Sequence, residues 1–132
     1  MQHLIVIGVI SGGMKSTNSH KKKRIEVYHK YNGHCAYCGT KLTVEDMQID
    51  HIVSKNRGGK DEVSNYNPSC RMCNFYKSDN SMESFRKMVG SLIVRLRKIF
   101  IFRLAERYGI ITINEDFKPV FYYERGAKEN DE

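Results

Sequence analysis

Four cysteines, arranged as two Cys-x-x-Cys pairs, are the residues of this 132-residue chain whose spacing most directly predicts chemistry. Cys35 and Cys38 form the first pair, Cys70 and Cys73 form the second, and the sequence has no other cysteine. Each pair sets two thiolates close enough to share one tetrahedral ion, with Zn–S bonds of about 2.3 Å. We therefore expect a structural zinc site that closes the segment between the pairs into a loop.

Other uses of paired cysteines fit this pattern less well. A disulfide framework requires an oxidising compartment and is typical of secreted chains. A thioredoxin-type redox motif uses a single pair near a βαβ unit. An iron–sulfur cluster takes the same thiolates, and spacing alone does not distinguish it from zinc. The paired spacing favours structural zinc.

A second group of polar residues lies within and just after that loop. Asp50 and His51 are adjacent, and Asn74 directly follows the last cysteine. Carboxylate and amide oxygens suit Mg²⁺ or Mn²⁺, while an imidazole titrates near neutral pH and suits a general base. Neighbouring residues on a regular strand face opposite sides. Asp50 and His51 can therefore share one site only if the strand ends or bends there.

In their order and spacing, these residues resemble the HNH endonuclease family. The resemblance covers residues 24–80 and rests on Cys-x-Tyr-Cys-Gly, Asp-His-Ile, a Gly-Gly turn and Ser-Asn-Tyr-Asn-Pro-x-Cys-x-x-Cys-Asn-x-x-Lys. It implies an α+β fold built on a ββα-metal finger, stapled here by a four-cysteine zinc site and flanked by an N-terminal helix and C-terminal helices. It also implies phosphodiester hydrolysis in DNA with one divalent ion, by nicking or by double-strand cleavage.

The resemblance gives a catalytic role to four residues. His51 corresponds to the general base, Asp50 to the acidic metal ligand, and Asn65 to the asparagine that braces the loop and so orients the histidine. Asn74 stands where the family usually has a final histidine. Phage junction resolvases and the HNH domain of RNA-guided CRISPR nucleases also have an asparagine at that position. The motif is thus His-Asn-Asn, and the expected catalytic ion is Mg²⁺ or Mn²⁺ held by Asp50 and Asn74, with the amide favouring Mg²⁺.

The formal net charge of +7 favours a polyanionic partner, which by resemblance is DNA. Arg57, in the Gly-Gly loop, is expected to contact the nucleic acid. Lys77 lies one helical turn beyond Asn74, where its ammonium either reaches a phosphate or remains in solvent. Arg95 and Arg103 belong to a basic stripe on the helices after residue 81. A DNA-backbone surface is favoured for that stripe, and a solvated face is the alternative.

Three regions are expected along the chain. Residues 1–20 are expected to be poorly structured, either as an upstream extension of a protein that starts at Met14 or as a short edge strand. Residues 21–80 form the HNH core, with a helix over 22–31, strands over 47–52 and 63–67, and a finger helix ending near 78. Residues 81–132 form a helical extension, capped by Ser81, with one helix to 98, a second to 108, a short strand over 118–123 and a charged tail.

No stretch of the sequence reaches the roughly 18 apolar residues of a membrane span, so no membrane partner is expected. The apolar run over residues 4–10 is short and lacks a preceding basic residue, which argues against a signal peptide. Reduced thiolates then fit an intracellular, cytoplasmic location, and small proteins of this type are often encoded by phages or mobile elements.

The leading hypothesis is a metal-dependent DNA endonuclease. The alternative is a zinc-stabilised nucleic-acid-binding module without catalysis, which leaves Asp50, His51 and Asn74 without a role. The apolar stripe over residues 82–104 further suggests a homodimer seam or a contact with a phage or mobile-element protein.

Overall fold

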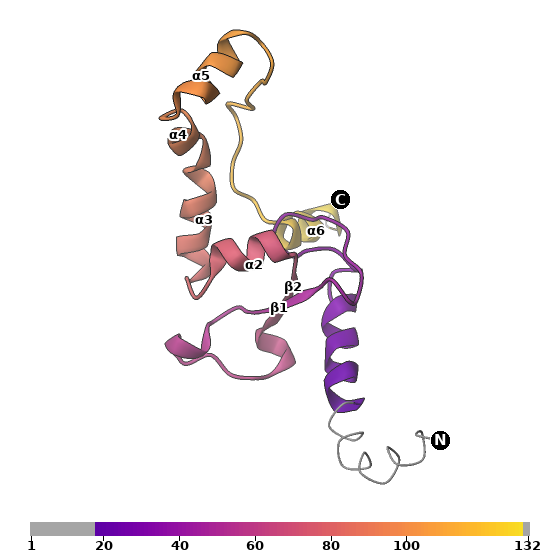
Figure 1. Cartoon of the computed structure of the whole chain (residues 1–132). Helices are drawn as coiled ribbons and strands as arrows, with labels where there is room; N and C mark the ends of the chain where they lie inside the picture. The colour runs from indigo at the N-terminus through magenta and orange to yellow at the C-terminus, as the bar shows by residue number, and fades with distance from the viewer. Residues whose placement is uncertain (1–17, 131–132) are drawn as a thin grey trace, which may run out of the picture.

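The computed structural model describes residues 18–130, and its centre is a two-stranded antiparallel sheet followed by a helix (Figure 1). Strand β1 (Gln48–His51) pairs with β2 (Tyr66–Ser69) so that Gln48 lies opposite Ser69 and His51 lies opposite Tyr66. Helix α2 (Arg71–Lys77) follows β2 at once and packs against β1. This ββα unit confirms the expected fold class.

The second strand begins three residues later than predicted. Residues 63–65 form a short 3-10 turn, η2 (Val63–Asn65), and a second such turn, η1 (Lys55–Arg57), lies earlier in the same loop. Asn65 uses its side chain to bridge this loop, and the strand starts only after it. Pro68 fits into β2 because the sheet has two strands, so its missing N–H is not needed by a third.

The N-terminal helix is described over residues 18–29, which extends it earlier than the predicted 22–31. Its Arg24 guanidinium donates to the backbone carbonyls of Val44 (Nε to O, 3.1 Å) and Met47, and this ties the helix to the segment before β1. Residues 18–20, predicted to be poorly structured, are helical. The remaining expectations for the N-terminus, a start at Met14 or an edge strand, fall outside the described residues.

In the hydrophobic core, the loop of the first cysteine pair packs against two residues that lie far apart in the C-terminal region. Tyr37 packs edge-on against Phe85 at 5.3 Å between ring centroids, and Phe85 stacks on Phe121 at 5.1 Å. The buried apolar side chains are Val27, Cys35, Ala36, Tyr37, Leu42, Met47, Tyr66, Phe85 and Phe121. Residues far apart in the sequence thus hold the first cysteine pair in place.

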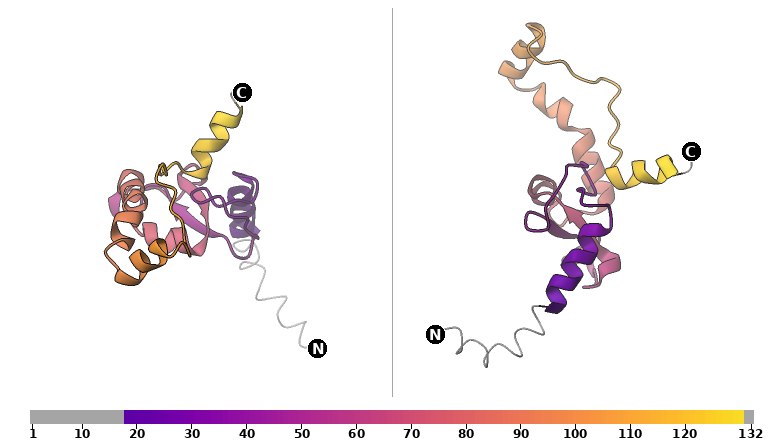
Figure 2. Two further views of the ribbon diagram at one scale, coloured as in Figure 1. Left: turned by 90° about the horizontal axis from the view of Figure 1, so that it is seen from above. Right: turned by 90° about the vertical axis from the view of Figure 1, so that its right-hand side faces the viewer.

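Three helices extend away from this core as an arm, defined here as residues 82–120 (Figures 1 and 2). They are α3 (Met82–Gly90), α4 (Leu92–Leu96) and α5 (Phe100–Arg107), after which the chain runs back toward the core. Ser81 caps α3 as predicted, because its side chain accepts a hydrogen bond from the Ser84 backbone at 3.1 Å. The prediction of a single helix to residue 98 was wrong. The helix breaks at Ser91, whose hydroxyl donates to the Met88 carbonyl at 2.8 Å.

The predicted strand over 118–123 is also wrong. Residues 122–130, which include part of the charged tail, form a helix, α6 (Tyr122–Asn130). The buried Phe121 fixes the start of α6, and its backbone N–H donates to the Glu124 carboxylate at 3.1 Å. The next two backbone N–H groups donate to carbonyls of the first cysteine pair, Tyr122 to Tyr37 and Tyr123 to Ala36, at 3.0 Å each. Tertiary partners that no local pattern reveals thus cap this helix.

Within residues 18–130, no helix has both the length and the apolar character that crossing a membrane requires.

Candidate functional site

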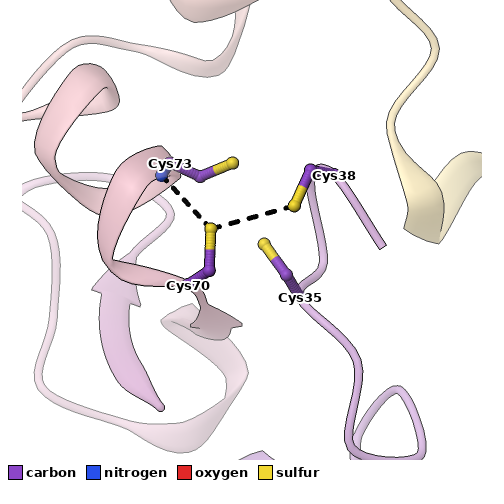
Figure 3. Close-up of side chains that lie close together, drawn as sticks. All are labelled: Cys35, Cys38, Cys70 and Cys73. Carbon is purple, nitrogen blue, oxygen red and sulfur yellow. Dashed lines mark hydrogen bonds between the residues drawn. The ribbon is translucent and has the colours of Figure 1, made fainter. Parts of the chain in front are cut away.

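The four cysteine sulfurs converge between the loop before β1 and the start of α2 (Figure 3). All four Sγ atoms lie within 4.8 Å of one another, and those of Cys38 and Cys70 are 3.8 Å apart. A tetrahedral ion with Zn–S bonds of about 2.3 Å sets its sulfurs about 3.8 Å apart. The four cysteines are free thiols and form a cluster with the size and donor set of a zinc site.

Hydrogen bonding and burial both act on the cysteine side chains that would bind the ion. Cys70 is the N-cap of α2, and its sulfur accepts from the Cys73 backbone N–H at 3.4 Å (Figure 3). Burial raises the pKa of the Cys38 thiol to about 11. A bound cation offsets that effect, because metals bind the thiolate form.

Asp50 is a buried carboxylate held from two sides. It lies on β1 and is 4% exposed. The Tyr37 hydroxyl donates to its Oδ2 atom, and the Lys77 Nζ lies 3.1 Å from the same oxygen and 3.3 Å from Oδ1. Burial raises the pKa of Asp50, while the hydrogen bond from Tyr37 and the charge of Lys77 act in the opposite direction. These contacts offset the cost of burying the carboxylate.

Lys77 does not lie where the sequence analysis placed it. Its side chain is 0% exposed, so neither the phosphate contact nor the solvated position is correct. The ammonium also donates to the His51 backbone carbonyl at 3.1 Å, which joins α2 to the end of β1. A sequence signal for this burial exists, since Lys77 is four residues beyond Cys73 and so shares the helix face that the cysteine cluster pins to the core.

His51 is the last residue of β1, and its side chain contacts other residues than the Asp50 side chain does, so their sharing of one site stays a prediction. The His51 side chain is 25% exposed, and its Nε2 atom lies 2.7 Å from Asp61 Oδ1. The ring of Tyr66 packs edge-on against the imidazole at 5.0 Å. Asp61 was not singled out from the sequence, because only the path of the loop brings it back to His51.

Asn65 spans the loop between the strands through its side chain. Its Oδ1 accepts from the Val53 N–H, and its Nδ2 donates to the carbonyls of Val53 and Lys60, each at 2.9 Å. These are the bracing contacts that were expected. Gly59 is needed beside them, because a Cβ there would lie 1.7 Å from the Val53 carbonyl oxygen.

Asn74 lies on α2, three residues before Lys77, and is half-buried. Residues three apart share a helix face, so Asn74 lies on the same face of α2 as Lys77, which pairs with Asp50. No described residue within 18–126 hydrogen-bonds to the Asn74 side-chain amide. Its oxygen is therefore available to a further partner.

The remaining residues predicted to contact DNA are exposed, and each donates a hydrogen bond to another residue of the protein. Arg57 Nε donates to the Asp79 carbonyl at 2.9 Å, and Arg103 donates to the Arg97 carbonyl at 2.8 Å. Arg95 donates to the Tyr76 hydroxyl. Arg57 belongs to the loop between the strands, whereas Arg95 lies on α4 and Arg103 on α5. Their contact with DNA stays a prediction.

Residues 35–80 match the family model of the HNH endonucleases. This segment is an HNH domain. The HNH domain spans both cysteine pairs and contains Asp50, His51, Asn65 and Asn74, so the resemblance seen in the sequence is confirmed.

The chain is also similar to solved structures. The type II-C Cas9 enzyme from Actinomyces naeslundii is similar to this chain, with 27% sequence identity and a TM-score of 0.48. The match covers 53% of this chain and 8% of the Cas9 chain, so this chain spans less than a tenth of that enzyme's length. No curated protein matches the sequence.

Proposed function

We propose that this protein is a metal-dependent DNA endonuclease that hydrolyses phosphodiester bonds through its HNH domain. One observation carries the proposal: the matched segment holds a partly exposed imidazole, His51, at the end of β1, and the residue before it, Asp50, is a buried carboxylate. The net charge of +7 suits a polyanionic substrate.

The cysteine cluster is proposed to hold structural Zn²⁺. Cys35, Cys38, Cys70 and Cys73 would be the four ligands, which leaves no open position for catalysis. The role of that ion is to fix α2 and the loop before β1 relative to the sheet.

Asp50 and Asn74 are proposed to hold the separate catalytic ion, Mg²⁺ or Mn²⁺. Their oxygens are hard donors, and the amide of Asn74 has no partner among residues 18–126. When bound, the ion would stabilise charge on the phosphoryl group and on the departing oxygen. A carboxylate offers about four lone-pair sites, so Asp50 retains capacity beyond Tyr37 and Lys77.

His51 is proposed to act as the general base. Its imidazole would remove a proton from the attacking water, which requires the neutral ring. Asn65 would support this step indirectly, because it fixes the loop that follows His51.

The alternative is a nucleic-acid-binding module without catalysis, and the Asp50–Lys77 pair favours it. A carboxylate already neutralised by a buried ammonium has less need of a metal ion. In that case the protein binds duplex DNA and leaves it intact.

The test is cleavage of supercoiled plasmid with Mg²⁺ or Mn²⁺, with and without chelator, by wild type and His51→Ala. We expect cutting by the wild type and a loss of about 10²- to 10⁴-fold in His51→Ala, with DNA binding retained. His29→Ala is the matched control, since His29 is exposed on the N-terminal helix. Equal rates for His51→Ala and wild type would falsify the mechanism, and binding without cutting by the wild type would support the alternative.

A further inference from the structure

Asp61 makes a short contact with the side chain of His51, although the two residues are ten positions apart. Its Oδ1 lies 2.7 Å from His51 Nε2. The same carboxylate is 3.0 Å from the Lys55 ammonium through Oδ2, and the Tyr66 hydroxyl lies 3.3 Å from Oδ1. Three groups thus converge on Asp61 and fix a side chain that is otherwise 57% exposed.

The charge of Asp61 decides which nitrogen of His51 carries the proton. The hydrogen bonds from His51 and Lys55 lower the pKa of Asp61 to about 2. At neutral pH the carboxylate is therefore ionised and can only accept hydrogen bonds. His51 Nε2 must be the donor. In the neutral imidazole, the lone pair is then on Nδ1.

We propose that Asp61 is a positioning residue that holds the His51 ring as its Nε2–H tautomer and so makes Nδ1 the nitrogen that accepts the proton from water. This inference rests on the proposed endonuclease function. As the water O–H bond breaks, its proton goes to Nδ1. The water oxygen then forms a bond to phosphorus while the bond from phosphorus to the departing 3′ oxygen breaks. The resulting imidazolium keeps its Nε2–H bond to the Asp61 carboxylate, which stabilises the positive charge.

The loop architecture supports this assignment. Asn65 Nδ2 donates to the carbonyl of Lys60, the residue directly before Asp61. Gly59 lets the loop pass against the Val53 carbonyl just before that point. The bracing by Asn65 therefore fixes the path that returns Asp61 to His51, and Tyr66 holds the ring further through its edge-on contact.

An ordinary surface ion pair is the competing explanation. Such pairs contribute little to stability, and their loss leaves tautomer and turnover unchanged. The decisive variant is Asp61→Asn, which keeps the size of the side chain but removes its charge. Glu62→Gln is the matched control, because Glu62 is exposed in the same loop and its replacement removes the same charge without touching the His51 contact.

The first measurement is a long-range ¹H–¹⁵N correlation spectrum of ¹⁵N-histidine-labelled protein, at a pH where the imidazoles are neutral. His51→Gln identifies the signals of His51. We expect the Nε2–H tautomer in wild type and in Glu62→Gln. In Asp61→Asn, a substantial fraction should convert to the Nδ1–H form.

The second measurement is steady-state cleavage of a defined duplex. We expect kcat of Asp61→Asn to fall about 10- to 100-fold, while KM stays constant or decreases because a negative charge near the DNA is removed. Melting temperature and zinc content should match those of Glu62→Gln, which separates positioning from folding.

Two results would overturn the inference: an Nδ1–H tautomer for His51 in wild type, or an Asp61→Asn variant whose spectrum and kcat equal those of Glu62→Gln. Failure of the proposed function has a different signature. If wild type does not cut DNA, the endonuclease proposal fails, and the spectrum still decides whether Asp61 controls the ring.

Discussion

At the scale of single residues, the pairing of Lys77 with Asp50 makes a prediction about stability. Both side chains are buried, so Lys77→Met leaves an uncompensated carboxylate in the core. Removing one partner of a buried ion pair typically costs about 3–5 kcal/mol. We expect a decrease of that order in the free energy of unfolding, measured by denaturant titration.

The double variant Asp50→Asn/Lys77→Met should recover part of that loss, because it removes both charges. Lys87→Met is the control, since Lys87 is exposed on α3. A Lys77→Met protein that unfolds at the same denaturant concentration as Lys87→Met would show that the two charges do not depend on each other.

The sequence was sufficient to predict side-chain contacts that belong to a motif. It was insufficient to predict contacts that depend on how the chain folds back on itself. Asn65 was expected to brace the loop, and its three backbone contacts are present. Lys77 was misplaced because lysines are rarely buried, and its partner is 27 residues away. Asp61 has no local pattern, because the loop alone brings it to His51.

At the scale of elements, the cysteine cluster connects the loop before β1 to α2, and α6 is capped on that loop. Chelation of the metal, or Cys73→Ser, should therefore lower the melting temperature and abolish binding of about one zinc ion per chain. Thermal melting and metal analysis measure the two effects. Met72→Ser is the control, since it places a serine on the exposed face of the same helix. Full zinc content in Cys73→Ser would contradict the assignment.

Helix α6 depends on one buried aromatic side chain. Phe121 is 3% exposed, stacks on Phe85, and stands where the Ala36 and Tyr37 carbonyls cap the helix. Phe121→Ala should destabilise the protein by about 3–5 kcal/mol, with a loss of helical circular dichroism. Val120→Ala, at a more exposed neighbouring position, should have a much smaller effect. Equal stability of the two variants would indicate that α6 is held by other contacts.

Elements with local signals were predicted better than elements defined by tertiary contacts. The cap at Ser81 and the finger helix, α2, follow from nearby residues. The strand expected over 118–123 did not form, because distant carbonyls cap a helix there and override β propensity. The break at Ser91 follows Gly90, a poor helix former that the apolar periodicity concealed.

At the scale of the whole molecule, the arm carries the predicted DNA-backbone contacts Arg95 and Arg103. Replacing both with Gln should weaken binding to every duplex alike and reduce the slope of log K against log salt by about 2. Fluorescence anisotropy at several salt concentrations measures that slope. Lys21→Gln/Lys22→Gln is the charge-matched control, on the N-terminal helix. Identical slopes for the two double variants would show that the effect comes from net charge and that the face is merely solvated.

The arm also exposes apolar side chains that the HNH domain does not use. Phe100 is 65% exposed and Ile101 is 72% exposed. Near the base of the arm, an apolar groove with a volume of about 620 Å³ lies between α2, α3 and the returning chain, and Phe75 and Phe117 help to line it. This distribution agrees with a homodimer or a protein partner, which stays a prediction.

The end of α3, where the chain leaves the core, is in contact with Pro119, where the chain returns to it. The Pro119 ring lies against Gly90, where an added Cβ would be 3.4 Å from it, and Arg86 donates to the Pro119 carbonyl at 2.9 Å. The segment between residues 90 and 119 therefore leaves and re-enters the molecule at one place. We expect a change in the length of that segment to leave His51 and the cysteine cluster in place. The fold thus separates the segment that carries the proposed catalytic residues from one whose length and sequence can vary.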